Sequence, residues 1–318
     1  MEKQDSVQRK KQPMRTIPKG VIQCPVTPFF DDGRIDFSTF EKVVDFHIKH
    51  EASSVCVALH IAESLNLTIQ EHKESIEVAV RVANGRLPVI ADVRLSGTDQ
   101  VIDLARHAEK VGADAVMCIT PYYWPSTEES QFRHFVAVGS AIGIPLIGYN
   151  SPVHQGGVSL SPRLLVRLIE SMDNFIGLKD ASTSFEYFIE ARRATQAVRP
   201  DFGIFTGVEY ILPSMVLGGG VGSMSVTAGV APNLVRDLYK ACKEGRYDEA
   251  RNLQDKASYL WQLFKVGYPA PIKAAMEIMG RPVGETRLPI LPVSKEGKRQ
   301  LLVNLQELGI IDQEPHGW

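Results

Sequence analysis

The sequence has few cysteines and no long hydrophobic run. Its 318 residues include four widely spaced cysteines that form no CxxC pair, namely Cys24, Cys56, Cys118 and Cys242. Neither a disulfide framework nor a cysteine zinc site is therefore expected. No apolar stretch approaches the roughly 20 residues that span a bilayer, and no signal-peptide pattern follows the N-terminal basic residues. We therefore expect a cytoplasmic protein that does not interact with membranes.

The sequence also lacks an excess of charge of either sign. It has 35 basic and 37 acidic residues, which give a formal net charge of -2. A protein that binds nucleic acid would normally carry a basic excess, so we expect no nucleic-acid partner. No HxxxH or HExxH motif and no carboxylate cluster shows metal-ligand spacing, so neither a metal site nor a cofactor is expected. A basic run at Arg9-Lys10-Lys11 indicates a solvated, flexible tail over residues 1–18.

Eight short apolar runs recur through residues 19–228, and each precedes a segment with helical spacing of apolar residues. The runs are nearly continuous in hydrophobicity, which is typical of parallel strands covered on both faces. Eight strand-helix units favour a closed α/β TIM (β/α)8 barrel over an open sheet. The expected strands are residues 21–26, 54–59, 88–93, 115–120, 145–149, 175–179, 202–206 and 221–226.

Residues 229–318 show helical patterns, most clearly at 234–242, 248–264 and 271–279. No linker or repeat divides the chain, so we expect this C-terminal helical region to pack on the barrel as part of one unit. N-cap residues are predicted at Asp36, Thr68, Thr98 and Ser161, each just before a helical pattern.

Two side chains stand where a barrel carries its chemistry, at the C-terminal ends of strands. Lys179 ends the sixth predicted strand, where burial would favour the neutral amine that attacks a ketone. The alternative is a structural lysine paired with a carboxylate such as Asp180 or Glu209. Tyr149 ends the fifth strand, so its phenol should approach Lys179 and could transfer protons there, although simple packing is the alternative.

Several motifs in a fixed order carry a resemblance to a known family. They include Pro25-Val26-Thr27-Pro28-Phe29, Thr120-Pro121-Tyr122-Tyr123, Tyr149-Asn150-Ser151-Pro152, Gly177-Leu178-Lys179-Asp180 and Gly222-Ser223-Met224-Ser225. Over about residues 20–308 the chain resembles the dihydrodipicolinate synthase and N-acetylneuraminate lyase group of class I aldolases.

The resemblance implies roles for these residues. Lys179 would form a Schiff base with pyruvate, and Tyr149 would be the proton-transferring phenol. Tyr123 would reach into the neighbouring subunit's site, which implies a homotetramer built from tight dimers. Ser223 and the backbone carbonyl of Met224 would lie among the groups that bind the 2-oxo acid.

Three departures from the family pattern concern specificity. The stretch Gly-Thr-Thr-Gly-Glu or Gly-Ser-Thr-Gly-Glu, which holds the pyruvate carboxylate in the family, reads Leu59-His60-Ile61-Ala62-Glu63 here. Backbone N–H groups at His60 and Ile61 could still bind a carboxylate, and His60 could replace the missing hydroxyl or act as a cationic anchor. His154 stands where the synthases carry a carboxylate-binding arginine, and Glu209 alone remains of the sialic acid lyases' acidic pair. Neither named activity is therefore expected.

The sequence thus predicts a Schiff-base-forming lyase, an aldolase or dehydratase, that acts on a 2-oxo acid and has pyruvate as substrate or product. An aldehyde is the expected second substrate of an aldolase. The alternatives are a 2-keto-3-deoxy sugar acid dehydratase and a catalytically weak 2-oxo acid binding protein.

Overall fold

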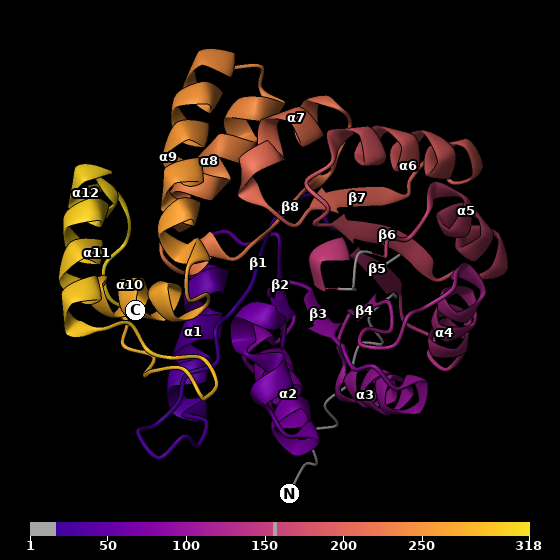
Figure 1. Ribbon diagram of the computed structural model, residues 1–318, viewed down its shortest axis with the longest axis horizontal. Coiled ribbons are helices and arrows are strands. Elements are labelled where there is room, and N and C mark those ends of the chain that lie inside the picture. The colour runs from indigo at the N-terminus through magenta and orange to yellow at the C-terminus, as the bar shows by residue number, and fades with distance from the viewer. Residues whose placement is uncertain (1–16, 155–157) are drawn as a thin grey trace, which may run out of the picture.

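The computed structural model describes residues 17–154 and 158–318, and its centre is a closed barrel of eight parallel strands in sequence order (Figure 1). Strand β1 pairs with both β2 and β8, which closes the sheet. The TIM barrel prediction is therefore confirmed. The strands are β1 (Gly20–Gln23), β2 (Ser54–Val57), β3 (Val89–Asp92), β4 (Ala115–Ile119), β5 (Leu146–Asn150), β6 (Phe175–Asp180), β7 (Gly203–Thr206) and β8 (Gly222–Ser225).

A helix follows each strand and covers the outside of the barrel (Figure 1). These helices are α1 (Phe37–Lys49), α2 (Ile69–Ala83), α3 (Thr98–Val111), α4 (Glu128–Ser140), α5 (Pro162–Ser171), α6 (Phe185–Val198), α7 (Leu212–Leu217) and α8 (Pro232–Lys243). The C-terminal region adds α9 (Tyr247–Lys265), α10 (Ala270–Ile278), α11 (Lys295–Glu307) and α12 (Ile310–Gln313), which lie together on one side of the barrel (Figure 1).

Three of the four predicted N-caps are confirmed. The side chains of Asp36, Thr68 and Ser161 each accept a hydrogen bond from a backbone N–H in the first turn of their helix. The prediction for Thr98 was wrong, because Gly97 is the N-cap and Thr98 is the first residue of α3. The Thr98 hydroxyl lies 2.9 Å from Nδ1 of His134, so it links α3 to α4.

The strand side chains alternate between the barrel interior and the helix layer, as in other barrels of this type. On β3, Ile90 belongs to the same buried cluster as Tyr149 and Met224. Val89 and Ala91, which flank Ile90, pack in a second cluster together with residues of the surrounding helices. The interior is therefore filled by side chains, and the chemistry must lie at a mouth of the barrel.

Ile17, which the sequence analysis placed in the tail, is buried beneath the barrel. A Cβ atom at Gly177 would lie 2.4 Å from Ile17 Cδ1, and one at Gly203 would lie 2.1 Å from Ile17 Cγ2. Both glycines therefore leave the space that Ile17 fills, near the amino end of β7. The rest of the predicted tail, residues 1–16, lies outside the described part of the chain.

Two classes of feature were searched for across residues 17–154 and 158–318. None of the helices there has the length and hydropathy needed to cross a bilayer. The same residues contain no group of three or more His, Cys, Asp or Glu side chains placed to hold a metal ion. The four cysteines are buried free thiols.

Candidate active site

Lys179 and Tyr149 lie side by side at the C-terminal ends of β6 and β5. The two residues are paired in the register of the sheet, and both are buried. The Lys179 Nζ atom lies 4.1 Å from the centre of the Tyr149 ring. The predicted approach of amine and phenol is therefore present.

The Lys179 amine is not held in a structural ion pair within the described part of the chain. Its Nζ atom is buried and has no hydrogen-bond partner among those residues. The two carboxylates considered as partners are bonded elsewhere, since Asp180 accepts from Asn150 and Ser182. Glu209 accepts from Ser225 at 2.7 Å and from Thr227 at 3.1 Å. A buried amine without a partner is the state expected of a nucleophile.

Gly207 leaves the space beside Lys179 open. It follows β7, and its backbone N–H donates to the Asp180 carbonyl at 2.6 Å. A Cβ atom at this position would lie 2.7 Å from Lys179 Cε and 2.9 Å from Ala181 Cβ. Any larger residue at position 207 would therefore push against the lysine side chain.

A buried guanidinium, that of Arg94, lies near the same tyrosine. Its guanidinium carbon is 5.1 Å from the centre of the Tyr149 ring, and its Nε atom donates to Asp92 at 2.8 Å. Burial acts to lower the pKa of Arg94, but Asp92 and other neighbouring groups together raise it above its ordinary value. The Tyr149 ring is thus bordered by the Lys179 amine and by the Arg94 guanidinium.

The sequence analysis missed Asp92 and Arg94. Both follow Ile90 at steps of two residues, so the strand alternation points them into the barrel. The signal that could have identified them was the presence of two charged residues, at alternate positions, at and just after the end of an apolar strand. The predicted strand stopped at residue 93, which assigned Arg94 to a loop.

His60 is fixed by a residue from the C-terminal region. It begins a short 3-10 turn, His60–Ala62, and its Nδ1 atom lies 2.6 Å from the Tyr268 hydroxyl. The His60 ring also lies nearly parallel to the Tyr149 ring, with 6.5 Å between centres. Burial raises the pKa of Tyr268 well above its ordinary value, so this hydroxyl is a neutral donor or acceptor at physiological pH. The sequence analysis did not identify Tyr268.

The turn that carries His60 and Ile61 is anchored below by buried polar contacts. Ile61 packs in the interior cluster, and Thr27 donates to the Ala62 carbonyl at 2.8 Å. The Glu63 carboxylate pairs with Lys273 at 2.8 Å. Burial lowers the pKa of Lys273 to about 8, against the opposing effect of Glu63. Glu63 is therefore positioned to hold the turn in place.

The structure places the remaining predicted residues as follows. Ser223 is buried on β8, and its hydroxyl has no hydrogen-bond partner among the described residues. Met224 is buried in the interior cluster. Tyr123 is 85% exposed and has a φ of 77°, so its ring projects from the structure. His154 ends the short turn Pro152–His154, but its side chain lies outside the described part of the chain.

A pocket of about 470 Å³ opens beside Tyr149 at the mouth of the barrel. Gly207 and Tyr149 border it from the barrel, and Trp261 and Lys265 border it from α9. The C-terminal region therefore forms part of the site. The sequence analysis predicted helix α9 but not its position at the mouth.

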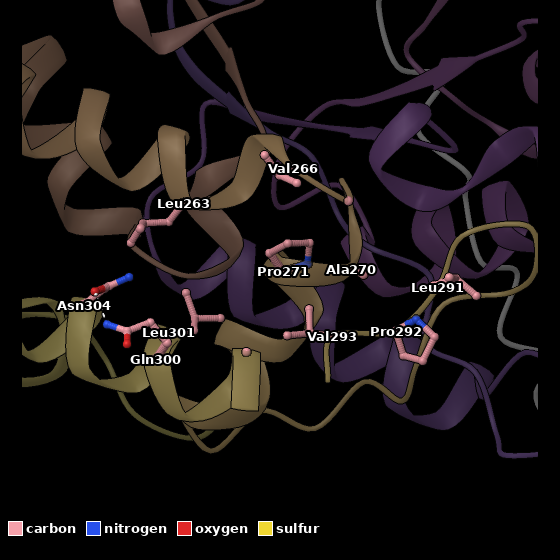
Figure 2. A pocket seen from close by; sticks show the side chains of 12 residues that line it. Leu263, Val266, Ala270, Pro271, Leu291, Pro292, Val293, Gln300, Leu301 and Asn304 are labelled. Carbon is pink, nitrogen blue, oxygen red and sulfur yellow. Dashed lines mark hydrogen bonds between the residues drawn. The ribbon is translucent and has the colours of Figure 1, made fainter. Parts of the chain in front are cut away.

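A second pocket, of about 440 Å³, lies between α9, α10 and α11 (Figure 2). Figure 2 shows mostly aliphatic side chains around it, with Gln300 and Asn304 at one side. Its lining includes no charged residue and none of the residues around Lys179. We therefore assign the chemistry to the pocket beside Tyr149.

Comparison with known proteins agrees with the geometry of the barrel. The model of the dihydrodipicolinate synthetase family matches residues 17–308. The chain is 35% identical over 299 residues to the 4-hydroxy-tetrahydrodipicolinate synthase of Gluconacetobacter diazotrophicus, covering 93% of this chain and 99% of that protein. It is 36% identical over 291 residues to the enzyme of the same name from Wolinella succinogenes, covering 91% and 97%.

A solved structure of the same fold superposes over nearly the whole chain. It is YagE, a prophage protein from E. coli K12 in complex with pyruvate, with a TM-score of 0.87 and 28% identity over 92% of this chain and 99% of that one. A match of this length in both sequence and structure covers the barrel together with the C-terminal helices. The chain therefore belongs to the dihydrodipicolinate synthetase family of class I lyases.

Proposed function

We propose that this protein is a Schiff-base-forming lyase in which Lys179 attacks the ketone of a 2-oxo acid, with pyruvate as substrate or product. The observation that carries the proposal is the buried Lys179 amine, which lies 4.1 Å from the centre of the Tyr149 ring and has no hydrogen-bond partner among the described residues. The nitrogen adds to the ketone carbon, and the carbinolamine then loses its hydroxyl as water to give an iminium.

Tyr149 is the proposed acid and base for these steps. Carbinolamine formation needs a proton at the ketone oxygen, and dehydration needs one at the same oxygen again. A phenol next to the amine can supply both. His60, whose ring lies 6.5 Å from the Tyr149 ring, takes the place of the hydroxyl that the family carries at this position.

The 2-oxo acid carboxylate is proposed to lie against the turn at His60 and Ile61. This turn is supported from below by Thr27 and by the Glu63–Lys273 pair, so its backbone is held in one position. Ser223 and the Met224 carbonyl complete the proposed binding groups, since both lie on β8, which is two strands away from both β2 and β6 in the closed barrel. Glu209 faces Ser225 and Thr227, so we propose that it orders the loop after β7.

A homotetramer built from tight dimers is proposed from the exposure of Tyr123. A tyrosine that is 85% exposed and lies next to the exposed Trp124 presents a large apolar area to solvent. Contact with a second copy would bury this area, and it would place the Tyr123 hydroxyl at the partner's site. Pyruvate and an aldehyde are then the proposed small-molecule partners.

Reductive trapping tests the proposal directly. Incubation with pyruvate and borohydride should add one reduced pyruvyl group per subunit, mapped by peptide mass spectrometry to Lys179. The Lys179→Ala variant should remain unlabelled, whereas a Lys240→Ala control on α8 should be labelled like the natural chain. Labelling at another lysine would contradict the proposal.

The same preparation separates the rival activities. Release of free pyruvate from a 2-keto-3-deoxy sugar acid would indicate an aldolase, and loss of water alone would indicate the dehydratase. A stoichiometric adduct without turnover of any substrate would indicate the 2-oxo acid binding protein.

A further inference from the structure

The pocket beside Tyr149 has a lining that differs from what a sugar acid or a short dicarboxylic aldehyde would require. Most of its wall is aromatic or aliphatic, from Trp261, Val153, Val208 and Val226 together with the Tyr149 ring. Among the described residues that line it there is no carboxylate, and the one lysine is Lys265. The Thr183 hydroxyl, also in the lining, donates to the Ser182 carbonyl at 2.6 Å. The other polar side chains in the lining are those of His60, Tyr149, Ser151 and Tyr210, which are few for the binding of a polyhydroxylated chain.

Trp261 forms the outer wall on α9. It is half-buried and contacts the Tyr268 ring edge-on, with 5.8 Å between ring centres. Tyr268 in turn bonds His60, so the indole belongs to a connected row of rings that ends at Tyr149. A flat apolar ligand would fit against such a row, because aromatic rings pair favourably at these distances.

Lys265 stands one helical turn beyond Trp261 and is exposed. Residues four positions apart lie on the same face of a helix, so both side chains border the pocket from the same side. No ion pair holds Lys265 within the described part of the chain. An ammonium at the rim would attract a negative group at the far end of a ligand whose body lies against Trp261.

We propose that the acceptor in this pocket is an aromatic or similarly apolar aldehyde, and that Lys265 favours one with a negatively charged group at its far end. This inference rests on the proposed function, because the enamine at Lys179 supplies the other reactant. The iminium at Lys179 first loses a proton from C3 to give the enamine. The enamine C3 carbon then bonds to the aldehyde carbon, which restores the iminium, and the aldehyde oxygen takes a proton to become a hydroxyl. Water then hydrolyses the iminium, which releases a 4-hydroxy-2-oxo acid and the free amine.

The test compares four aldehydes with pyruvate: benzaldehyde, 4-carboxybenzaldehyde, glyceraldehyde and aspartate semialdehyde. Initial rates of condensation are measured by mass spectrometry of the 4-hydroxy-2-oxo acid or its cyclised product. The two aromatic aldehydes should give kcat/KM values at least about tenfold above the other two, and 4-carboxybenzaldehyde should be the better of the pair. Faster turnover of glyceraldehyde or aspartate semialdehyde would overturn the proposal.

Two variants locate the effect. Trp261→Ala should lower kcat/KM for both aromatic aldehydes about tenfold or more, whereas Tyr259→Ala on the same helix should not. Lys265→Met should lower the value for 4-carboxybenzaldehyde by about 10- to 100-fold, the range of a charge-assisted contact, and leave benzaldehyde within about twofold. Lys243→Met on α8 is the matched control. Equal rates in Lys265→Met and its control would contradict the role of Lys265.

Trapping of pyruvate separates this inference from the function on which it rests. Both α9 variants should still form the borohydride-reduced adduct at Lys179, which also shows that they are folded. If the adduct forms and the aromatic aldehydes are not used, the acceptor inference is wrong and the Schiff-base function stands. If the natural chain forms no adduct, the proposed function itself is wrong.

Discussion

The Tyr268 hydroxyl lies 2.6 Å from Nδ1 of His60, although the two residues are 208 positions apart in the chain. His60 stands in the turn after β2, and Tyr268 in the turn between α9 and α10. This contact defines how the imidazole is oriented beside Tyr149. We therefore propose that Tyr268 is a positioning residue, which would act on the reaction through His60.

Replacement of Tyr268 by Phe should slow the reaction by removing this contact. One hydrogen bond contributes about 0.5–1.5 kcal/mol, so we expect kcat/KM to fall by roughly two- to tenfold. His60→Ala should cost more, and the double variant should be no slower than His60→Ala alone. The measurement is a double-mutant cycle on the rate of pyruvate adduct formation. Additive effects of the two substitutions would show that Tyr268 acts independently of His60.

Tyr149→Phe should slow turnover by roughly 10²- to 10⁴-fold, the usual contribution of a positioned acid and base. The phenyl ring keeps the packing of Tyr149 in the interior cluster, so the protein should stay folded. Steady-state rates and a thermal melt of the same sample check both statements. An active Tyr149→Phe enzyme would leave this tyrosine with a packing role only.

Subunit mixing tests the proposed contact of Tyr123. Tyr123→Phe should slow turnover, and Lys179→Ala should abolish it. If Tyr123 serves the partner's site, a mixture of the two variants should regain activity through hybrid dimers, because one site then has both groups. The measurement is activity after co-refolding, with each variant refolded alone as the control. No recovery in verified hybrids would place Tyr123 outside the partner's site.

Gly207→Ala should block adduct formation. The added Cβ would lie 2.7 Å from Lys179 Cε and 2.9 Å from Ala181 Cβ, so the lysine side chain must leave the position that it holds in the natural chain. A fall of at least about tenfold in the trapping rate is expected, as for other small displacements of reacting groups. Gly143→Ala is the control, because its Cβ would meet only the end of the Glu109 side chain, at 3.1 Å. Equal trapping in both variants would show that Lys179 tolerates the displacement.

Stability at low pH should depend on Glu71. The Arg287 guanidinium lowers the pKa of Glu71 to about 2, below the ordinary value of 4.5. The folded state therefore holds the proton less tightly than the unfolded state does, so the pair stabilises the fold above pH 4.5. This contribution is lost as pH falls from 4.5 toward 2.

Glu71→Gln should accordingly reduce the free energy of unfolding at pH 7, by about 1 kcal/mol because solvent screens a partly exposed pair. The difference between the variant and the natural chain should shrink as pH falls below 4.5. Denaturant unfolding at a series of pH values provides the measurement, and Glu74→Gln on the exposed face of α2 is the control. A difference that is constant with pH would contradict the ion-pair origin of the effect.

The sequence predicted the barrel because each buried parallel strand is a nearly continuous apolar run. It predicted strand ends less well. The run at residues 21–26 continues past β1, which ends at Gln23, because Cys24 and Val26 are buried in the interior cluster beyond the end of the strand. The apolar pattern of the sequence reflects which residues are buried, whereas the bounds of a strand reflect which residues pair with a neighbouring strand.

The candidate site could likewise be predicted only in part from the sequence. Lys179 and Tyr149 end strands, so the register of neighbouring strands was enough to bring them together. Trp261, Lys265 and Tyr268 reach the mouth through the packing of α9 against the barrel, and helical periodicity does not encode which surface a helix covers. Arg94 was missed for a simpler reason, since it follows the apolar run and lies two residues beyond Asp92, where β3 ends.

The position of α9 separates two properties that many enzymes combine in one place, namely the covalent chemistry and the selection of the substrate. The proposed covalent chemistry lies on side chains of β5 and β6, whereas Trp261 and Lys265 belong to a helix that follows the complete barrel. Substitutions on α9 can therefore alter which molecules are accepted while the nucleophile and its neighbours keep their geometry. Within one family, mutations in a C-terminal helix of this kind would change the substrate preference while the residues that carry out the reaction stay the same.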